Sequence, residues 1–548
     1  MLSSVGRFID RMIAVPFPNW GLSRMMSRAT MDQIEAFSGS GAGYDAGKKN
    51  RLAGWVTQGA KENALPHEQI TNLRDRSWHL YRNNPHAKKI VRSIESRVIG
   101  DGISLESLAT KADGSSLDDF RKRAKQLWEE IGAGFDFRGM PGQGGLSFVG
   151  LKKMALRASI MSGGAMAQLR PITKQEQRER SLPVPLTLQL IDIERLWQER
   201  IGNPNDGENV IYRGIELDRN GRRVRYWVSE VDPQIAGYLG EPKPIPASEI
   251  IHLFVEEDID QYHGVPWFAP ALLKAQRTDD YEYNELIAAA MSACVVMAVK
   301  RATGGGKLGL NIGANESSTD GDGNQYTKLA PGMIIDVGKD GAIEGFNPMR
   351  PGTNAESFIQ HLLRSTAGAF PGVKSSTVTG DFRNSSFSSE RSAENDAFPE
   401  VLGVQEWFAV SFLQPIYDRV LDAAVADGYF DGIITADEYN ANRARFQKAK
   451  WQGPVSLSIT PKDDVQAAMM RIQSGISTPQ IECAKLNLNW RDIVTQYGEF
   501  ITFAEQQNIP VEFVNSILGM EKNNVLDVPG EISTGGAGNA GQQTSNAA

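Results

Sequence analysis

The sequence predicts an α+β protein in which helical segments flank a block of short antiparallel strands. Three observations lead to this class. Apolar residues recur every three or four positions between residues 70 and 98, which is the period of an amphipathic helix. Between residues 165 and 255 the period changes to short, β-branched or alternating runs. No glycine occurs over residues 268–300, where the single Pro270 falls in the first turn, so this stretch is the longest helical candidate.

The first half of the chain divides at glycines and prolines. Residues 1–61 are predicted to form an N-terminal arm, because residues 29–60 are rich in Gly, Ser and Ala. Pro85 is expected to separate two helices, and Gly100 and Gly102 to end the second. Further helices are expected at residues 116–131 and 148–162. Strands are expected at residues 165–171, 186–191, 210–217, 223–228 and 250–255, with Asn220 and Gly221 as a hairpin turn.

The second half returns to helical patterns. After the helix predicted at 266–300, residues 302–352 are rich in glycine and read as strands and turns. A shorter helix is expected at 354–370 and a long one at 388–427, which Pro399 and Pro415 should kink or divide. The region from Thr435 is predicted to be mostly helical. Residues 530–548 are rich in Gly, Ser, Asn and Gln and are expected to be disordered.

Composition limits the class of function. The 548 residues suffice for two to four domains, and the net charge of −8 argues against a general nucleic-acid coat, although local contacts with DNA stay possible. Cys294 and Cys483 lie far apart and form no CxxC, which argues against a thiolate metal cage. No run of 18 apolar residues is present, so we expect no membrane span.

The sequence contains no complete motif for catalysis, for cofactor binding or for metal binding. Lys48 and Lys307 each lack the hydroxyl residue that follows the lysine of a phosphate-binding loop. His67 and Glu68 begin a zinc-protease pattern whose second His would fall at Thr71. The acidic run at 256–260 could hold a hard cation, but a solvated loop is the simpler interpretation. We therefore expect no enzyme activity, no cofactor and no metal ion.

One polar loop, within residues 367–393, is the most informative part of the chain. Loops of more than a dozen residues without structure of their own are uncommon and usually functional. Lys374, Phe382 and Arg383 are its bulky or cationic residues between Val373 and Phe387; the rest is dominated by serine and threonine, without His or Cys. This composition suits sliding contact better than catalysis. In the alternative interpretation, Phe382 holds the loop on the following helix and Arg383 pairs with Glu390 or Glu394.

The same loop resembles the loop that precedes the long helix in lambda-type tailed-phage portal proteins. Its matching residues are Phe370-Pro371, Thr379-Gly380-Asp381 and 386–391, with Phe387 in place of a tyrosine. Other segments resemble the family in the same order, at residues 73–77, 82–87, 98–103, 246–254, 261–267, 459–462 and 475–478. The chain departs from the family pattern at Gly164, where the family often has Glu, at His263, where it has Arg, and at Thr460, where it has Asp.

The resemblance implies a ring oligomer, commonly of twelve subunits, at one capsid vertex, assembled in the host cytoplasm and present in the virion. Such a ring is the channel through which double-stranded DNA is packaged and ejected. It implies contacts with the terminase large subunit, a head-tail adaptor and the major capsid protein, and none with a membrane. A non-ring head-completion or scaffolding protein is the alternative.

The family plan also divides the chain. It places the wing at 62–265, the first stem helix at 266–301, the clip at 302–352 and the second stem helix at 353–371. The channel loop follows at 372–388, the long wing helix at 389–434 and the C-terminal wing and crown at 435–529.

Two sets of charged residues then have possible roles. Asp279, Asp280, Glu282 and Glu285 form an acidic band in the first long helix; on a ring whose helices line a pore, the band would repel DNA and reduce sticking, whereas on a monomer it would only aid solubility. A basic segment from Arg74 to Arg97 could contact phosphate or pair with an acidic neighbouring subunit, or it could be a solvated face.

Overall fold

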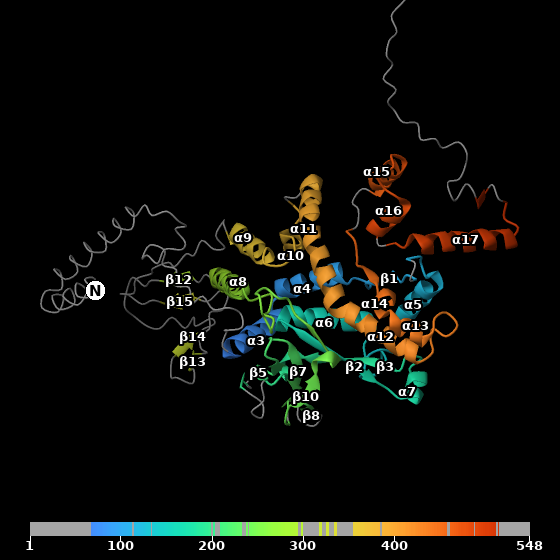
Figure 1. Cartoon of the computed structure of the whole chain (residues 1–548). Helices are drawn as coiled ribbons and strands as arrows, with labels where there is room; N and C mark the ends of the chain where they lie inside the picture. Colours follow the sequence, from blue (N-terminus) through green and yellow to red (C-terminus); the bar gives the residue numbers. More distant parts are fainter. Residues whose placement is uncertain are drawn as a thin grey trace, which may run out of the picture. The chain divides into compact units, whose positions relative to one another are not determined.

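The computed structural model describes most of the chain from His67 to Val514. The described residues are 67–111, 114–132, 134–198, 201–202, 209–232, 237–238, 240–293, 297–299, 317–319, 325–327, 334–336, 355–383, 386–456, 461–486, 488–510 and 513–514. The predicted N-terminal arm and C-terminal tail, and most of the glycine-rich segment 302–352, lie outside them. Figure 1 gives the arrangement of the elements.

Two helices begin the described chain, and they divide where the sequence predicts. Helix α3 (His67–Asn83) is followed by α4 (Pro85–Val98), and the side chain of Asn84 caps α4 by accepting a hydrogen bond from Ala87 N. Proline at the first position of a helix costs no hydrogen bond. Helix α3 is held by buried Arg74, whose Nε donates to Ser162 O at 2.8 Å.

The helices α5 (Asp118–Glu130) and α6 (Phe148–Ser162) complete the N-terminal helical part. Helix α6 has the predicted bounds because both ends carry strong signals. The hydroxyl of Ser147 accepts from Gly150 N at the start, and Gly163, at φ +81°, ends the helix in the left-handed conformation.

Antiparallel strands follow, as predicted, and they form two separate sheets. One has the strand order β11-β2-β3, from Ile250–Leu253, Ala165–Pro171 and Leu186–Asp192. The other has the order β10-β7-β6-β5-β4, from Lys243–Pro246, Arg223–Val228, Ile215–Leu217, Val210–Tyr212 and Ile201–Gly202. Short connecting elements are α7 (Lys174–Glu179), η3 (Ile193–Arg195), η4 (Ala247–Glu249) and the pair β8 (Val231–Asp232) and β9 (Gly237–Tyr238).

The single strand expected at 210–217 is wrong: it is a hairpin of β5 and β6. Arg213 and Gly214 make the turn, and both have positive φ, at +46° and +82°. Two central residues with positive φ are the mark of a type I′ turn, which matches the twist of the flanking strands. The first central residue of such a turn is usually Asn or Asp. Because Arg213 stands there, the sequence gives no signal for the hairpin.

The long helix predicted at 266–300 is shorter. Helix α8 covers Leu272–Ala293, and strand β12 (Met297–Val299) pairs in parallel with β15 (Ile334–Asp336). Residues before α8 form turns instead, with Ala269 N donating to Pro266 O and Ala271 N to Phe268 O. A proline disfavours helical backbone in the residue before it, and Pro270 therefore delays the start. Strands β13 (Ser317–Thr319) and β14 (Gln325–Thr327) form a further pair.

Helix α9 (Ala355–Ala367) packs beside α8 (Figure 1). After the loop, α11 (Phe387–Phe408) continues through a π-helical turn, Ala409–Leu413, into α12 (Gln414–Ala426). The division falls at Pro415, because proline has no N–H for the preceding turn. Pro399 lies inside α11, and the helix continues past it.

The main core joins these parts. It contains α4, α5, α6 and α12, with fully buried Ile90, Phe120, Leu156 and Tyr417. A second, smaller core around Met166, Ile191 and Tyr226 lies between the two sheets. Strand β1 (Ser104–Ser107) pairs with β16 (Ala449–Gln452), which brings the C-terminal part of the chain back to the N-terminal helices. The remaining helices are α13 (Ala436–Ala441), α14 (Arg443–Phe446), α15 (Pro461–Gln473), α16 (Pro479–Lys485) and α17 (Trp490–Gln506).

Two histidines with buried Nε2 atoms, His252 in β11 and His263 in the segment after it, have lowered pKa values, which predict that stability depends on pH. The rings of His252 and His263 lie 6.2 Å apart, and the buried Nε2 of each has no hydrogen-bond partner among the described residues. Burial, and then the charges of Arg74 and Arg213, lower the pKa of His263 to about 3. Burial and the neighbouring His263 also lower the pKa of His252 well below its ordinary value.

We expect the thermal midpoint to fall as pH drops below about 6.5, because the unfolded chain then binds protons that the folded histidines do not accept. Above that pH the two imidazoles are neutral in both the folded and the unfolded chain. The two histidines then have no effect on how the thermal midpoint changes with pH. A His263→Phe variant should lose part of the slope between about pH 6.5 and pH 5, whereas exposed His79→Gln should keep it. Equal slopes in the parent and in the His263→Phe variant would contradict this assignment.

Candidate functional site

The polar loop between α9 and α11 has a rigid first half. Phe370 is buried and its ring centroid lies 4.5 Å from that of Phe268. Arg97, in the last turn of α4, donates from Nη1 to Gly372 O at 2.8 Å, and Gly372 N donates to Glu400 Oε2 at 2.6 Å. Gly372 has φ +67°, and a Cβ there would lie 2.3 Å from Val401 Cγ2. The loop therefore starts in a position that only glycine fits.

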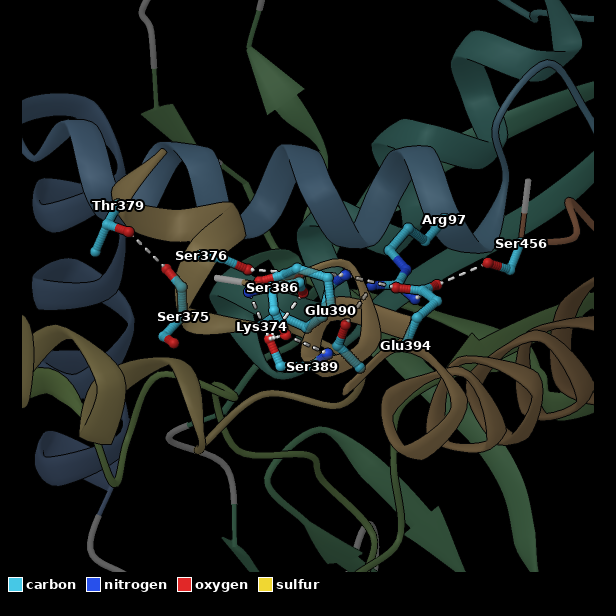
Figure 2. A network of polar contacts seen from close by, with 11 residues as sticks. Arg97, Lys374, Ser375, Ser376, Thr379, Ser386, Ser389, Glu390, Glu394 and Ser456 are labelled. Carbon is cyan, nitrogen blue, oxygen red and sulfur yellow. Dashed lines mark hydrogen bonds and ion pairs between the residues drawn. The ribbon is translucent and has the colours of Figure 1, made fainter. Parts of the chain in front are cut away.

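A network of four charged side chains continues this half of the loop (Figure 2). Lys374 Nζ lies 2.9 Å from Glu394 Oε2 and 3.2 Å from Glu390 Oε2, and Arg97 Nη2 pairs with Glu394 Oε1. The four side chains are only 18–20% exposed. Ser376 Oγ donates to Glu390, and Ser456 Oγ donates to Glu394. We call Arg97, Lys374, Glu390 and Glu394 the loop clamp.

The clamp is electrostatically balanced, with two cations and two carboxylates. Burial alone would raise the pKa of Glu394, but the hydrogen bond from Lys374 and the charge of Arg97 hold it below its ordinary value. Glu394 therefore stays ionised at neutral pH. Because the pair partners come from α4, the loop and α11, the clamp ties three parts of the chain together.

The second half of the loop is open. The short helix α10 (Ser375–Thr379) ends at Gly380, which has φ +69° and open space where a Cβ would lie. Beyond it Phe382 is 56% exposed, and the side chain of Arg383 is 71% exposed. Arg383 pairs with Asp381 and with Glu356 of α9, and its hydrogen bonds lower the pKa of Asp381 to about 2. We call residues 381–383 the loop tip.

The three predicted loop residues thus fall into two environments. Lys374 belongs to the clamp, whereas Phe382 and Arg383 belong to the tip. The expectation that Arg383 pairs with Glu390 or Glu394 is wrong, because Lys374 occupies both carboxylates and Arg383 pairs with Asp381 and Glu356. The loop is also not without structure, since it contains α10. Arg97 was one of several basic residues in the sequence, and no local spacing distinguishes it.

The predicted acidic band divides as well. Asp279 accepts a hydrogen bond from Asn84 Nδ2 at 3.1 Å, and Glu282 lies 3.9 Å from His86 Nε2. Glu285 is 9% exposed, and together with His86 and Glu282 it lines a pocket between α8 and α9. These three carboxylates therefore lie on the side of α8 that packs within the chain. Asp280 lies on the opposite side and is exposed.

The described residues hold no group of three or more potential metal-binding side chains. Within the same described part of the chain, no helix has the length and apolar character needed to cross a bilayer.

Comparison with known proteins decides the family. Residues 48–405 match the model of the lambda family of phage portal proteins. The chain belongs to this family. This portal protein is 20% identical to the portal protein of Escherichia phage N15 over 86% of its own length and 90% of the relative. It is 25% identical to a probable portal protein of Halomonas phage phiHAP-1, covering 62% and 64% of the two chains.

Portal protein B of Escherichia phage lambda is 23% identical, over 54% of this portal protein and 60% of its relative. A solved chain from the neck of a native gene transfer agent particle, computed with C12 symmetry, matches with a TM-score of 0.36 at 12% identity, covering 77% and 94% of the two chains. As a member of the family, this portal protein is a structural component of the virion's head-tail connector and not an enzyme.

Proposed function

We propose that this portal protein forms a ring of twelve subunits at one capsid vertex, through which double-stranded DNA is packaged and later ejected. The observation that carries the proposal is the loop between α9 and α11, whose clamped first half holds an exposed tip with one aromatic and one cationic side chain. A fixed support with a small exposed tip suits repeated contact with a moving polymer. Such a protein reads the DNA backbone and not its sequence.

The tip has the chemistry for weak, reversible contact with phosphate. Arg383 pairs with Asp381 and with Glu356, and the side chain of Glu356 is 65% exposed. An ion pair between two exposed side chains contributes about 0–1 kcal/mol. A phosphate can therefore replace Glu356 at small cost. Each subunit of a ring would contact phosphate weakly, and the contacts of all the subunits with one duplex would add. The ring would then hold the DNA and still release it readily. Lys374 is not available in the same way, because the clamp holds it.

We assign the family's parts to the chain as the sequence suggests. The wing is 62–265, the stem helices are 266–301 and 353–371, the clip is 302–352, and the C-terminal wing and crown are 435–529. In this assignment the clip receives the terminase large subunit and later the head-tail adaptor, and the outer surface contacts the major capsid protein. Assembly takes place in the host cytoplasm.

The tip can be tested by a double variant, Phe382→Ala with Arg383→Ala. Rings that carry it should retain less full-length genome before tail attachment, and the salt dependence of DNA retention should fall by about one phosphate contact for each subunit. Nuclease-protected DNA after packaging in vitro measures both effects. Arg76→Ala, an exposed arginine on α3, is the matched control.

The double variant should assemble normally, since both side chains are exposed. Packaging and retention like those of the parent would show that the tip only lines the channel and that DNA contact lies elsewhere. Rings that fail to form at all in the parent would instead defeat the channel proposal itself.

A further inference from the structure

The segment between β11 and α8 is held against the end of α6 by backbone contacts. Trp267 N donates to Ile160 O of α6 at 3.0 Å. Gly264 lies directly against Gly163, because a Cβ on Gly264 would come within 1.9 Å of Gly163 O. We call residues 261–267 the link, since they lead from the sheet that contains β11 toward α8.

Two departures from the family pattern meet at this contact. Gly164 stands where the family often has Glu, and His263 stands where the family has Arg. A Cβ on Gly164 would lie 3.6 Å from His252 Nε2, and the ring of His252 lies 6.2 Å from the ring of His263. A glutamate and an arginine at these two positions would bring opposite charges to the contact. In this chain neither position carries a permanent charge.

The charged side chains that act on the two histidines are cationic. Three arginines from three different elements do so: Arg74 of α3, Arg213 of the β5–β6 turn and Arg223 of β7. Burial lowers the pKa of Arg74 to about 10, although the carboxylates of Glu194 and Asp192 oppose the shift. Among the described residues, no carboxylate forms an ion pair with either histidine ring.

The remaining polar neighbours of the two rings are uncharged. Tyr226 Oη lies 3.4 Å from His252 Nδ1, and burial raises the pKa of Tyr226 to about 12. His263 has a hydrogen bond with the backbone of Tyr212. These contacts leave the buried Nε2 of each ring without a hydrogen-bond partner in the part of the chain that the structure describes. A proton added at either Nε2 would therefore find no acceptor.

We infer that the link is a proton-responsive joint, in which protonation of His252 and His263 separates the link from the end of α6 while both cores stay folded. Each proton adds a positive charge beside the arginines without an acceptor, which disfavours the closed contact. Opening exposes the imidazolium rings to water. The link therefore opens more often as the pH falls below about 6.5, the ordinary pKa of histidine. Opening loosens the connection between the sheets and α8 within a single chain, so the inference does not rest on the proposed ring.

Hydrogen exchange of the full-length protein at pH 7.5 and pH 5.5 tests the joint. After correction for the direct effect of pH on exchange, the link should exchange faster at pH 5.5 by about tenfold for each histidine that binds a proton on opening. Residues 372–380 contain no histidine and should keep the same corrected rate. Equal acceleration in the link and in residues 372–380 would contradict a local joint.

A matched pair of variants at position 164 tests the role of charge. Gly164 does not have left-handed backbone, so a side chain there meets no strain of that kind. Gly164→Glu brings a carboxylate beside His252 Nε2 and should remove most of the acceleration at pH 5.5, because the protonated rings then have an acceptor. Gly164→Gln has the same size without the charge and should keep the acceleration. If both variants remove it equally, packing and not charge closes the link, which would refute the joint.

A third variant needs no room for a larger side chain. His263→Gln should lose about a tenfold share of the acceleration between pH 7.5 and pH 5.5, because one of the two titrating groups is absent. Exposed His79→Gln should behave like the parent. A link that accelerates in His263→Gln as much as in the parent would overturn the inference, whether or not Gly164→Glu folds.

Discussion

A Gly372→Ala variant should lose about 3 kcal/mol of stability in the loop region, combining the cost of left-handed backbone with that of overpacking. The added Cβ would lie 2.3 Å from Val401 Cγ2 and 3.1 Å from Ala397 O. Val401 is 2% exposed and cannot move away without disturbing the core. Hydrogen exchange of residues 372–380 measures the change as a lower free energy of local opening.

Gly380→Ala is the matched control for this variant. Gly380 has nearly the same backbone conformation, with φ +69° against +67°, but nothing lies within 4 Å of its Cβ position. Gly380→Ala should therefore lower the free energy of local opening by only about 1 kcal/mol, which is the cost of left-handed backbone in a residue with a Cβ. Equal losses in the two variants would mean that close packing against α11 does not hold the start of the loop.

A Glu394→Ala variant should accelerate hydrogen exchange of residues 372–380 by on the order of tenfold or more, which corresponds to about 1.4 kcal/mol or above. The change leaves Arg97 and Lys374 mostly buried with one carboxylate fewer. Breaking a largely buried pair is costly because the remaining charge stays without compensation.

Glu230→Ala removes an ion pair of another kind and is its control. Glu230 and Lys243 are 60% and 66% exposed, so their separation should leave exchange in the loop unchanged. A Glu394→Ala variant that exchanges like the parent would show that hydrogen bonds to Gly372, and not the clamp, fix this half of the loop.

Local signals made much of the fold predictable. Ser147 and Gly163 bound α6, Asn84 and Pro85 separate α3 from α4, and Pro415 marks the division before α12. These residues act on the backbone beside them, so their effect can be derived without knowledge of the fold. The hairpin at Arg213 escaped because an arginine seldom adopts positive φ, and only the surrounding sheet makes it do so.

The sequence predicts which loop residues belong to the candidate site, but not which partners they contact. The sequence singles out Lys374, Phe382 and Arg383, yet Lys374 lies in the clamp because of Arg97, whose hydrogen bond to Gly372 spans 275 residues of sequence. No local pattern can indicate a partner at that separation. The four acidic residues of α8 illustrate the same limit. Helical spacing shows that they cannot all share one face, but only the packing of α4 and α9 decides which face is covered.

The clamp also has a mechanical consequence. Arg97 bonds to the loop and to Glu394 of α11, and Gln405 of α11 donates to Arg97 O and to Pro454 O, in the segment that follows β16. A sideways force on the exposed tip would therefore be transmitted to α4, to α11 and to the segment that follows β16. In the proposed channel, stiffness of this kind would hold the start of the loop in place under load, and the few residues beyond Gly380 would be the part that moves.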